Sequence, residues 1–163
     1  MSAFPKASHN HEPCMRTALA EAEAVARRRK LRFTPMRKRV LEIILESHRA
    51  IGAYDILRKI GGTAPPTVYR ALDFLLREGF VHRIDTLNAY APCFSPARRH
   101  ATHFLLCTRC GRAAEIDHDG LDSALAEAAE KAGFVVARET VEIAGLCAAC
   151  AGNSARPSPP PST

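Results

Sequence analysis

The chain has 163 residues and a mass of 17.8 kDa, which is enough for one ordinary domain or two small ones and too little for a barrel-sized enzyme. Hydrophobic residues make up 47% of it and charged residues 25%, proportions typical of a soluble globular protein. The net charge of +6 is uneven, because residues 1–92 hold 16 basic and 9 acidic residues, whereas residues 93–163 hold 7 and 8. A basic first half predicts contact with a polyanion, and a solvated basic surface is the alternative.

The sequence predicts two blocks between two tails. Residues 1–15 hold two Pro and several polar residues, which indicates a flexible tail, and residues 153–163 form a Pro/Ser segment that favours disorder. A junction near residues 86–100 separates the blocks, which we place at residues 16–92 and 93–152. No apolar run suits a membrane span or a secretory signal, so we expect a cytoplasmic protein whose six Cys residues bind metal or stay free.

The first block has the pattern of helices followed by a hairpin. An Ala-rich stretch over residues 16–31 contains good helix formers throughout. Thr34 is a suitable N-cap for the next helix, and Pro35 suits its first position. The remaining expected elements are a short helix over 53–60, a helix from Pro66 to Gly79, and strands over 80–85 and 89–91.

This order of elements is that of a winged helix-turn-helix, in which the second helix of the pair enters the major groove of DNA. The helix that begins at Pro66 is the expected recognition helix, because its apolar residues form one face and its polar residues the other. We expect DNA contacts from Thr67, Tyr69 and Arg70 on that helix. Phosphate contacts are expected from basic residues such as Arg37, Lys38 and Arg39. A small helical bundle without a ligand is the alternative.

The second block predicts a small α/β domain. Its expected elements are strands over 103–107 and 113–117, a helix over 121–132 and a strand over 134–143. The whole chain is therefore expected to be an α+β protein, with an N-terminal winged helix-turn-helix followed by this smaller domain.

Two CxxC pairs are the strongest motif in the sequence. Cys107 and Cys110 form one pair, and Cys147 and Cys150 form the other. Four thiolates from two such pairs can surround a zinc ion tetrahedrally at ~2.3 Å. A closed site of this kind stabilises folding and leaves no position for catalysis. The alternative is one redox-active dithiol beside an unrelated pair.

A second candidate group lies around the junction and comprises His82, Cys93, His100, His103 and Glu115. Its members come from both blocks. His82 lies in the predicted hairpin, Cys93 in the junction, and His100 and Glu115 in the second block. Their N, S and O atoms suit zinc, and a metal bound there fixes the angle between the blocks. Each residue taken alone has a simpler explanation as a surface or core residue. In the N-terminal tail, His9, His11 and Cys14 form a weaker group, for which a mobile tail is the favoured interpretation.

Several motifs together carry a family resemblance. They are YDIL at 54–57, PPTVYRALDFLLREGFVHR at 65–83, NAYAPC at 88–93, His100 with CTRCG at 107–111, and GLCAAC at 145–150. With these residues the chain resembles the ferric uptake regulator family, and within it the zinc uptake regulators, over roughly residues 16–150. The longer string ALDFLLREGFVHR and the position of Cys93 indicate the zinc branch.

The resemblance implies a homodimer with a winged helix followed by a dimerisation domain, which represses zinc-uptake genes when zinc is plentiful. It implies two zinc ions per chain. Their ligands are Cys107, Cys110, Cys147 and Cys150 for a structural zinc, and His82, Cys93, His100 and Glu115 for a regulatory zinc. Tyr54 matches a residue that contacts DNA bases, and Arg70 matches an arginine that reads a purine. His103 matches the place of a third metal ligand, with Asp122 or Glu139 as its candidate partners.

Three other functions stay open from the residues. The first is an iron, manganese or peroxide sensor, against which Cys93 argues, because a thiolate with two imidazoles and a carboxylate suits tetrahedral zinc. The second is a zinc enzyme, which we do not expect, because HExxH is absent and four protein ligands leave no open position for a substrate. The third is a thiol redox sensor that releases zinc on oxidation. We expect operator DNA and a second copy of the chain as partners, with no membrane and no small-molecule substrate.

Overall fold

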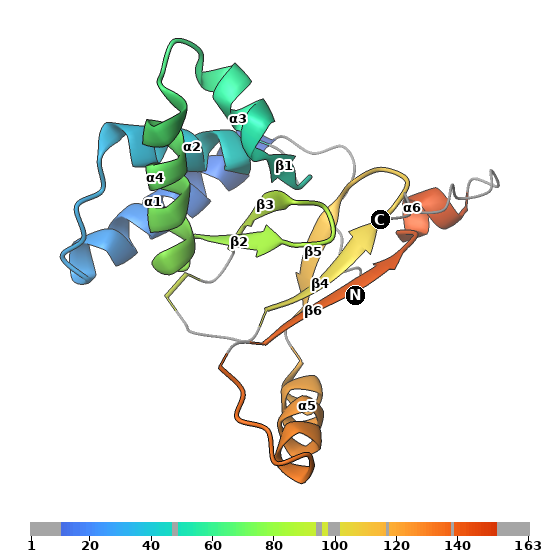
Figure 1. Ribbon diagram of the computed structural model, residues 1–163. Helices are drawn as coiled ribbons and strands as arrows, with labels where there is room; N and C mark the ends of the chain where they lie inside the picture. Colours follow the sequence, from blue (N-terminus) through green and yellow to red (C-terminus); the bar gives the residue numbers. More distant parts are fainter. Residues whose placement is uncertain are drawn as a thin grey trace.

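The computed structural model describes residues 11–46, 49–93, 96–97, 102–116, 118–137 and 139–152. Figure 1 shows that the first part of the chain forms a helical unit with a small sheet. Beside that sheet lies a second sheet, which has one long and one short helix. The α+β class is as predicted. Both segments expected to be loose, 1–10 and 153–163, lie outside the described residues, as does His100.

The first unit contains the helices that the sequence predicts. They are α1 (His11–Arg28), α2 (Pro35–Leu45), α3 (Ala53–Ile60) and α4 (Pro65–Arg77). Thr34 caps α2 by accepting a hydrogen bond from the Arg37 backbone N–H at 3.4 Å, and Pro35 occupies the first turn as expected. One boundary is wrong, because residues 11–15, expected in the flexible tail, form the first turns of α1.

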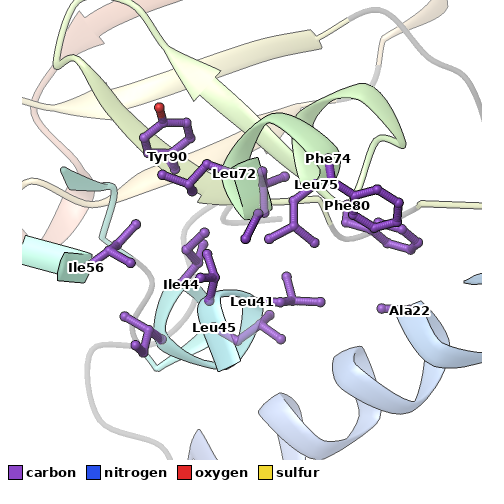
Figure 2. Close-up of a cluster of buried hydrophobic side chains, with 14 of the residues drawn as sticks. Ala22, Leu41, Ile44, Leu45, Ile56, Leu72, Phe74, Leu75, Phe80 and Tyr90 are labelled. Carbon is purple, nitrogen blue, oxygen red and sulfur yellow. The ribbon is translucent and has the colours of Figure 1, made fainter. Parts of the chain in front are cut away.

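The core of this unit joins α2 to α4 (Figure 2). Leu41 and Ile44 of α2 and Leu72 and Leu75 of α4 are at most 2% exposed. Burying each such side chain contributes about 1.5–3 kcal/mol relative to exposure. Because this core fixes the inner face of α4, its opposite face is held in solvent.

A three-stranded antiparallel sheet forms the wing. Its strands are β1 (Ile51–Gly52), β2 (Val81–Ile84) and β3 (Ala89–Pro92), in the order β1-β3-β2. Asn88, with a φ of 45°, turns the chain between β2 and β3, as the sequence predicts. β1 was not expected, because two residues are too few for an alternating pattern to show.

The second unit has a three-stranded sheet, with β4 (Thr102–Cys107) between β5 (Ala113–Ile116) and β6 (Thr140–Gly145). β4 pairs antiparallel with β5 and parallel with β6, and α5 (Asp119–Lys131) lies in the crossover between β5 and β6. The short helix α6 (Ala148–Ala151) follows β6.

The expected strand over 134–143 is wrong in its first half. β6 begins only at Thr140, and the apolar residues Phe134 and Val135 are 68% and 89% exposed in the single chain. An apolar run predicts a buried strand, but the described residues of one chain leave Phe134 and Val135 largely uncovered. α6 was not predicted, because four residues carry no helical period.

Wing and second sheet pack against each other through a small apolar cluster. Ile84 and Ala91 of the wing contact Phe104 and Leu106 of β4 and Ala113 of β5. Their burial places the wing over one face of the second sheet (Figure 1). Among the described helices, none has both the length and the apolar character needed to cross a membrane.

Candidate functional site

The two CxxC pairs meet at one end of the second sheet. Cys107 ends β4 beside Gly145 of β6, so the parallel pairing brings the chain past the first pair just before the second begins. The Thr108 backbone N–H donates to the Gly145 carbonyl at 2.9 Å and fixes this junction. One Sγ atom from each of the four residues lies within 4.8 Å of the others. The four are Cys107, Cys110, Cys147 and Cys150.

These four thiols fit a tetrahedral zinc ion. A tetrahedron with ~2.3 Å Zn–S bonds has S···S edges of ~3.8 Å, and the Cys110 and Cys147 sulfurs are 3.9 Å apart. Burial opposes ionisation of Cys107, but hydrogen bonds from the Cys147, Cys110 and Arg109 backbones outweigh it and lower its pKa to about 6. Burial, hydrogen bonds from the Cys150 thiol to the neighbouring cysteine sulfurs and the negative charge of Cys110 raise the pKa of Cys150 to about 12. A metal dication that replaces the Cys150 proton would balance the negative charge of the neighbouring ionised sulfurs.

Two arginines reinforce this cluster. The Arg112 guanidinium donates to the Cys110 sulfur at 3.3 Å and to the Cys147 sulfur at 3.2 Å. Arg109 donates to the Cys150 carbonyl oxygen at 2.5 Å and so ties α6 to the first CxxC turn. Neither role is evident from the sequence, where each arginine is marked just by a position inside or next to the first CxxC pair. Such outer contacts orient metal ligands and balance their charge.

A second cluster joins the wing to the second sheet. His82 of β2, Cys93 directly after β3 and Glu115 of β5 each bring one ligand atom within 4.8 Å of the others. His82 Nε2 lies 3.3 Å from a Glu115 oxygen, and Cys93 is 6% exposed. Its three donor types, imidazole, thiol and carboxylate, suit zinc. His100 was expected here as the fourth ligand, and it lies outside the described residues.

His103, expected in the junction group, lies instead in a third cluster on the opposite face of β4, because successive side chains of a strand point to opposite faces. His103 is only 1% exposed, with Nε2 2.5 Å from an Asp122 oxygen of α5 and 3.7 Å from a Glu139 oxygen. Among the described residues, the buried Nδ1 of His103 and one Glu139 oxygen have no hydrogen-bond partner. Both residues that the sequence offered as partners of His103 are therefore beside it. Glu139 lies directly before β6. The second sheet thus has candidate ligand groups on both faces, with Glu115 on one and His103 on the other.

The expected DNA-contacting residues are all exposed, Tyr54 on α3 and the other three on α4. Tyr54 is 76% exposed and Tyr69 46% exposed, and Thr67 and Arg70 are exposed as well. These exposed side chains are therefore accessible to a partner.

The basic residues of α2 have local partners. The Arg37 guanidinium lies 3.6 Å from the centre of the Phe74 ring, and Lys38 forms an ion pair with Glu23 at 2.7 Å. Arg39 pairs with Glu42 at 3.3 Å. Of the tail group, Cys14 is exposed on α1, and His9 lies outside the described residues.

A winged helix joined to a second domain through clustered imidazole, thiol and carboxylate groups defines the class of metal-responsive DNA-binding proteins. The model of the ferric uptake regulator family matches residues 28–144, and the chain belongs to this family. It is 39% identical over 137 residues to the zinc uptake regulation protein of Escherichia coli K12. The matched region covers 81% of this chain and 80% of that protein.

Solved structures show the same likeness. A zinc uptake regulator complexed with zinc and DNA is 38% identical, covering 85% of this chain and 95% of its own, with a TM-score of 0.79. The holo form of XcZur is 39% identical, covering 83% and 98%, also with a TM-score of 0.79. The apo form of XcZur reaches a TM-score of only 0.50 at 38% identity and 84% and 97% coverage. Because the two forms share a name and differ in state, the present arrangement of the chain resembles the holo form.

Proposed function

We propose that this chain is a zinc-responsive transcriptional repressor, which binds operator DNA as a zinc-loaded homodimer and represses zinc-uptake genes. The observation that carries the proposal is the cluster of His82, Cys93 and Glu115, because it places donors suited to zinc on both sides of the contact between wing and second domain. The likeness to zinc uptake regulators, one of them with zinc and DNA, supports the same function.

Two zinc ions per chain are part of the proposal. Cys107, Cys110, Cys147 and Cys150 hold a structural ion, whose role is to keep β4, β6 and α6 together. The residues His82, Cys93, His100 and Glu115 hold the regulatory ion. When bound there, zinc supplies a tetrahedral centre that holds the wing, the junction and the second sheet in one arrangement.

The regulatory mechanism follows from where these ligands are attached. His82 and Cys93 move with the wing, whereas Glu115 moves with the second sheet. With the site empty, the arrangement loses the support of the metal and keeps that of the apolar cluster and the hydrogen bonds between the units. The DNA-competent arrangement is then a smaller share of the population. Zinc raises that share because its ligands converge only in this arrangement.

DNA recognition is assigned to the exposed surface of α3 and α4. In a dimer the two α4 helices enter successive major grooves ~34 Å apart. Arg70 donates to a guanine edge, Tyr54 packs on a base or a thymine methyl group, and Thr67 and Tyr69 lie beside them. Phosphate contacts are assigned to basic residues such as Arg37, Lys38 and Arg39, of which Arg39 is exposed and pairs with Glu42 at 3.3 Å.

Homodimerisation is supported by what the second unit leaves uncovered. α5 extends away from the sheet (Figure 1), and Phe134, Val135, Val136 and Ile143 are exposed. Within the described residues, β6 is also an edge strand of its sheet. A second copy packed here covers all three features. We take residues 93–152 as this dimerisation domain and residues 16–92 as the DNA-binding domain.

Membership of a family of regulators agrees with the expectation that the chain is not an enzyme. A cytoplasmic location is proposed with the function, because a bacterial operator is reached there.

Zinc analysis and operator binding test the proposal together. We expect two zinc ions per chain, falling to one after mild chelation under reducing conditions, with loss of operator binding at the same step. His82→Ala and Cys93→Ser should each remove the zinc dependence, while His118→Ala, a change of an exposed histidine, serves as the matched control. Retained zinc dependence in both variants would reject the regulatory site. Three zinc ions per chain would show that the His103 cluster also loads.

The same chelation experiment decides between the alternatives. Loss of DNA binding without any oxidant excludes a sensor that depends on thiol oxidation. Recovery of binding with iron or manganese at lower free concentration than zinc would identify a sensor of another metal.

A further inference from the structure

A carboxylate of the second sheet holds the turn of the wing. Glu142 of β6 accepts the Asp85 backbone N–H on Oε1 at 2.6 Å and the Thr86 backbone N–H on Oε2 at 2.9 Å. Those donors are 57 and 56 residues away in sequence and belong to the turn between β2 and β3. Both oxygens of one side chain are thus used on the backbone of the other unit.

The strand register shows why Glu142 faces the wing. Phe104 of β4 is in register with Glu142 on one side and with Glu115 of β5 on the other. Residues paired across a sheet share a face, so these three side chains form a row. Phe104 packs against Ile84 of the wing, and its ring lies 5.6 Å from that of His82. The row therefore presents two carboxylates to the wing, one on each side of Phe104.

These two carboxylates have different partners. Glu115 lies beside His82 in the candidate regulatory metal cluster. Glu142 contacts backbone N–H groups, so its two hydrogen bonds involve no metal ligand. Burial opposes ionisation of Glu142, but hydrogen bonds from Thr86 and Asp85 outweigh it and lower its pKa, so the side chain is a carboxylate at neutral pH. The Asp85 side chain, which has the same sign of charge, pairs with Arg83 at 3.0 Å.

We propose that Glu142 is a metal-independent latch, a positioning residue that holds the wing turn on the second domain and thereby sets how much zinc is needed for DNA binding. The proposal rests on the zinc-dependent function proposed above. Its two hydrogen bonds exist only when the wing lies on the second sheet, which is the arrangement that the regulatory metal also requires. Zinc and the latch therefore favour the same arrangement of the two units. Without the latch that arrangement is less populated before zinc binds, so more zinc is needed to reach the same DNA binding.

The test is a zinc titration of operator binding with E142Q, E142D and the control E130Q, which removes one exposed charge from α5 in the same domain. Gln offers one acceptor oxygen where the carboxylate offers two, and Asp keeps the charge on a side chain shorter by one methylene. For E142Q and E142D we expect the zinc concentration at half-maximal binding to rise about tenfold, the effect of losing one charged hydrogen bond. At saturating zinc the loss of affinity should be smaller. E130Q should match the unmodified protein.

Electrostatics alone predicts the opposite sign. Removing a negative charge near DNA strengthens binding at every zinc concentration. Tighter binding by E142Q, or a zinc response of E142D equal to that of the unmodified protein, would therefore overturn the latch.

A second measurement does not depend on DNA or on zinc sensing. Hydrogen–deuterium exchange at the Asp85 and Thr86 amides of the zinc-loaded protein should be faster in E142Q than in E130Q. Unchanged exchange at both amides would overturn the proposal even if operator binding changes. If the unmodified protein binds its operator without zinc, the proposed function fails, and the exchange comparison still decides whether the latch exists.

Discussion

The two cysteine-containing clusters differ in where their side chains are attached. The four-cysteine cluster lies within the second unit, and its ligands come from β4, the following turn and the segment around α6. The His82, Cys93 and Glu115 cluster lies between two units. A metal inside one unit stabilises that unit, because its ligands are near each other only in the folded state. A metal between units instead selects their relative arrangement, which is what a switch requires.

The hydrogen bonds around the clusters show the same difference. Arg112 and Arg109 bind the sulfurs and the backbone of the four-cysteine cluster from within the same unit. Around the second cluster, the supporting contacts run between units, from the Phe104 row to the wing. An isolated backbone bridge between Arg49 and Arg112 also crosses this boundary. The first cluster is therefore expected to keep its metal, and the second to exchange it.

The largest expected effect is loss of a ligand from the four-cysteine cluster. Cys107→Ser removes a buried thiol whose metal site contributes on the order of 10 kcal/mol of folding free energy in small zinc domains. We expect zinc loss at this site, dissociation of the dimer and a second unit without a cooperative thermal transition, as measured by calorimetry and sedimentation. The corresponding change at exposed Cys14, Cys14→Ser, should leave both properties unchanged. A folded dimer for Cys107→Ser would remove the distinction between the two clusters.

The next effect concerns the cluster between the units. Cys93→Ser should lower operator affinity in the presence of zinc by about 100-fold, the upper range of typical coupling between two ligand sites. The dimer and its remaining zinc should persist, because the residues of the four-cysteine cluster are untouched. Fluorescence anisotropy with operator DNA and elemental analysis measure the two outcomes separately. Loss of both zinc ions from this variant would show that the clusters are not independent.

A smaller effect is expected at the DNA surface. Arg70→Ala should reduce the preference for operator over unrelated DNA by about 1–3 kcal/mol, because one contact to a guanine edge is lost. Zinc content and the zinc concentration for half-maximal binding should remain as in the unmodified protein. Competition binding with operator and scrambled duplexes at fixed salt measures the preference. An equal loss on both duplexes would assign Arg70 to a phosphate instead of a base.

The smallest effect concerns the support around the structural cluster. Arg112→Ala removes two N–H donors from the sulfurs of Cys110 and Cys147 and should speed zinc transfer to a chelator about tenfold. Arg112→Lys retains the positive charge without the planar guanidinium group. Its rate of zinc transfer should lie between those of the unmodified protein and Arg112→Ala. A chromogenic chelator assay follows the rate. If the exchangeable zinc leaves faster while the tightly held zinc does not, Arg112 serves the arrangement of the units and not the cluster.

Much of the local structure could be predicted from residues that act on their neighbours. Thr34 and Pro35 start α2, Asn88 turns the wing hairpin, and the apolar period of α4 separates its buried face from Tyr69 and Arg70. Each depends on interactions within one turn or one helix, so a single sequence contains the information. β1 and α6 were missed because elements of two and four residues show no period.

Sequence by itself supplied the candidate donor sets, which are two CxxC pairs and the group around the junction of His82, Cys93, His100, His103 and Glu115. Only the tertiary structure decided which donors meet, because parallel pairing of β4 with β6 brings residues some forty positions apart to one end of a sheet. The same pairing places Glu142 in register with Phe104, and packing of the wing on that row brings its carboxylate to the Asp85 turn. The apolar residues Phe134 and Val135 predict a buried strand but are exposed in the single chain. An apolar run does not reveal whether the surface that covers it belongs to the same chain.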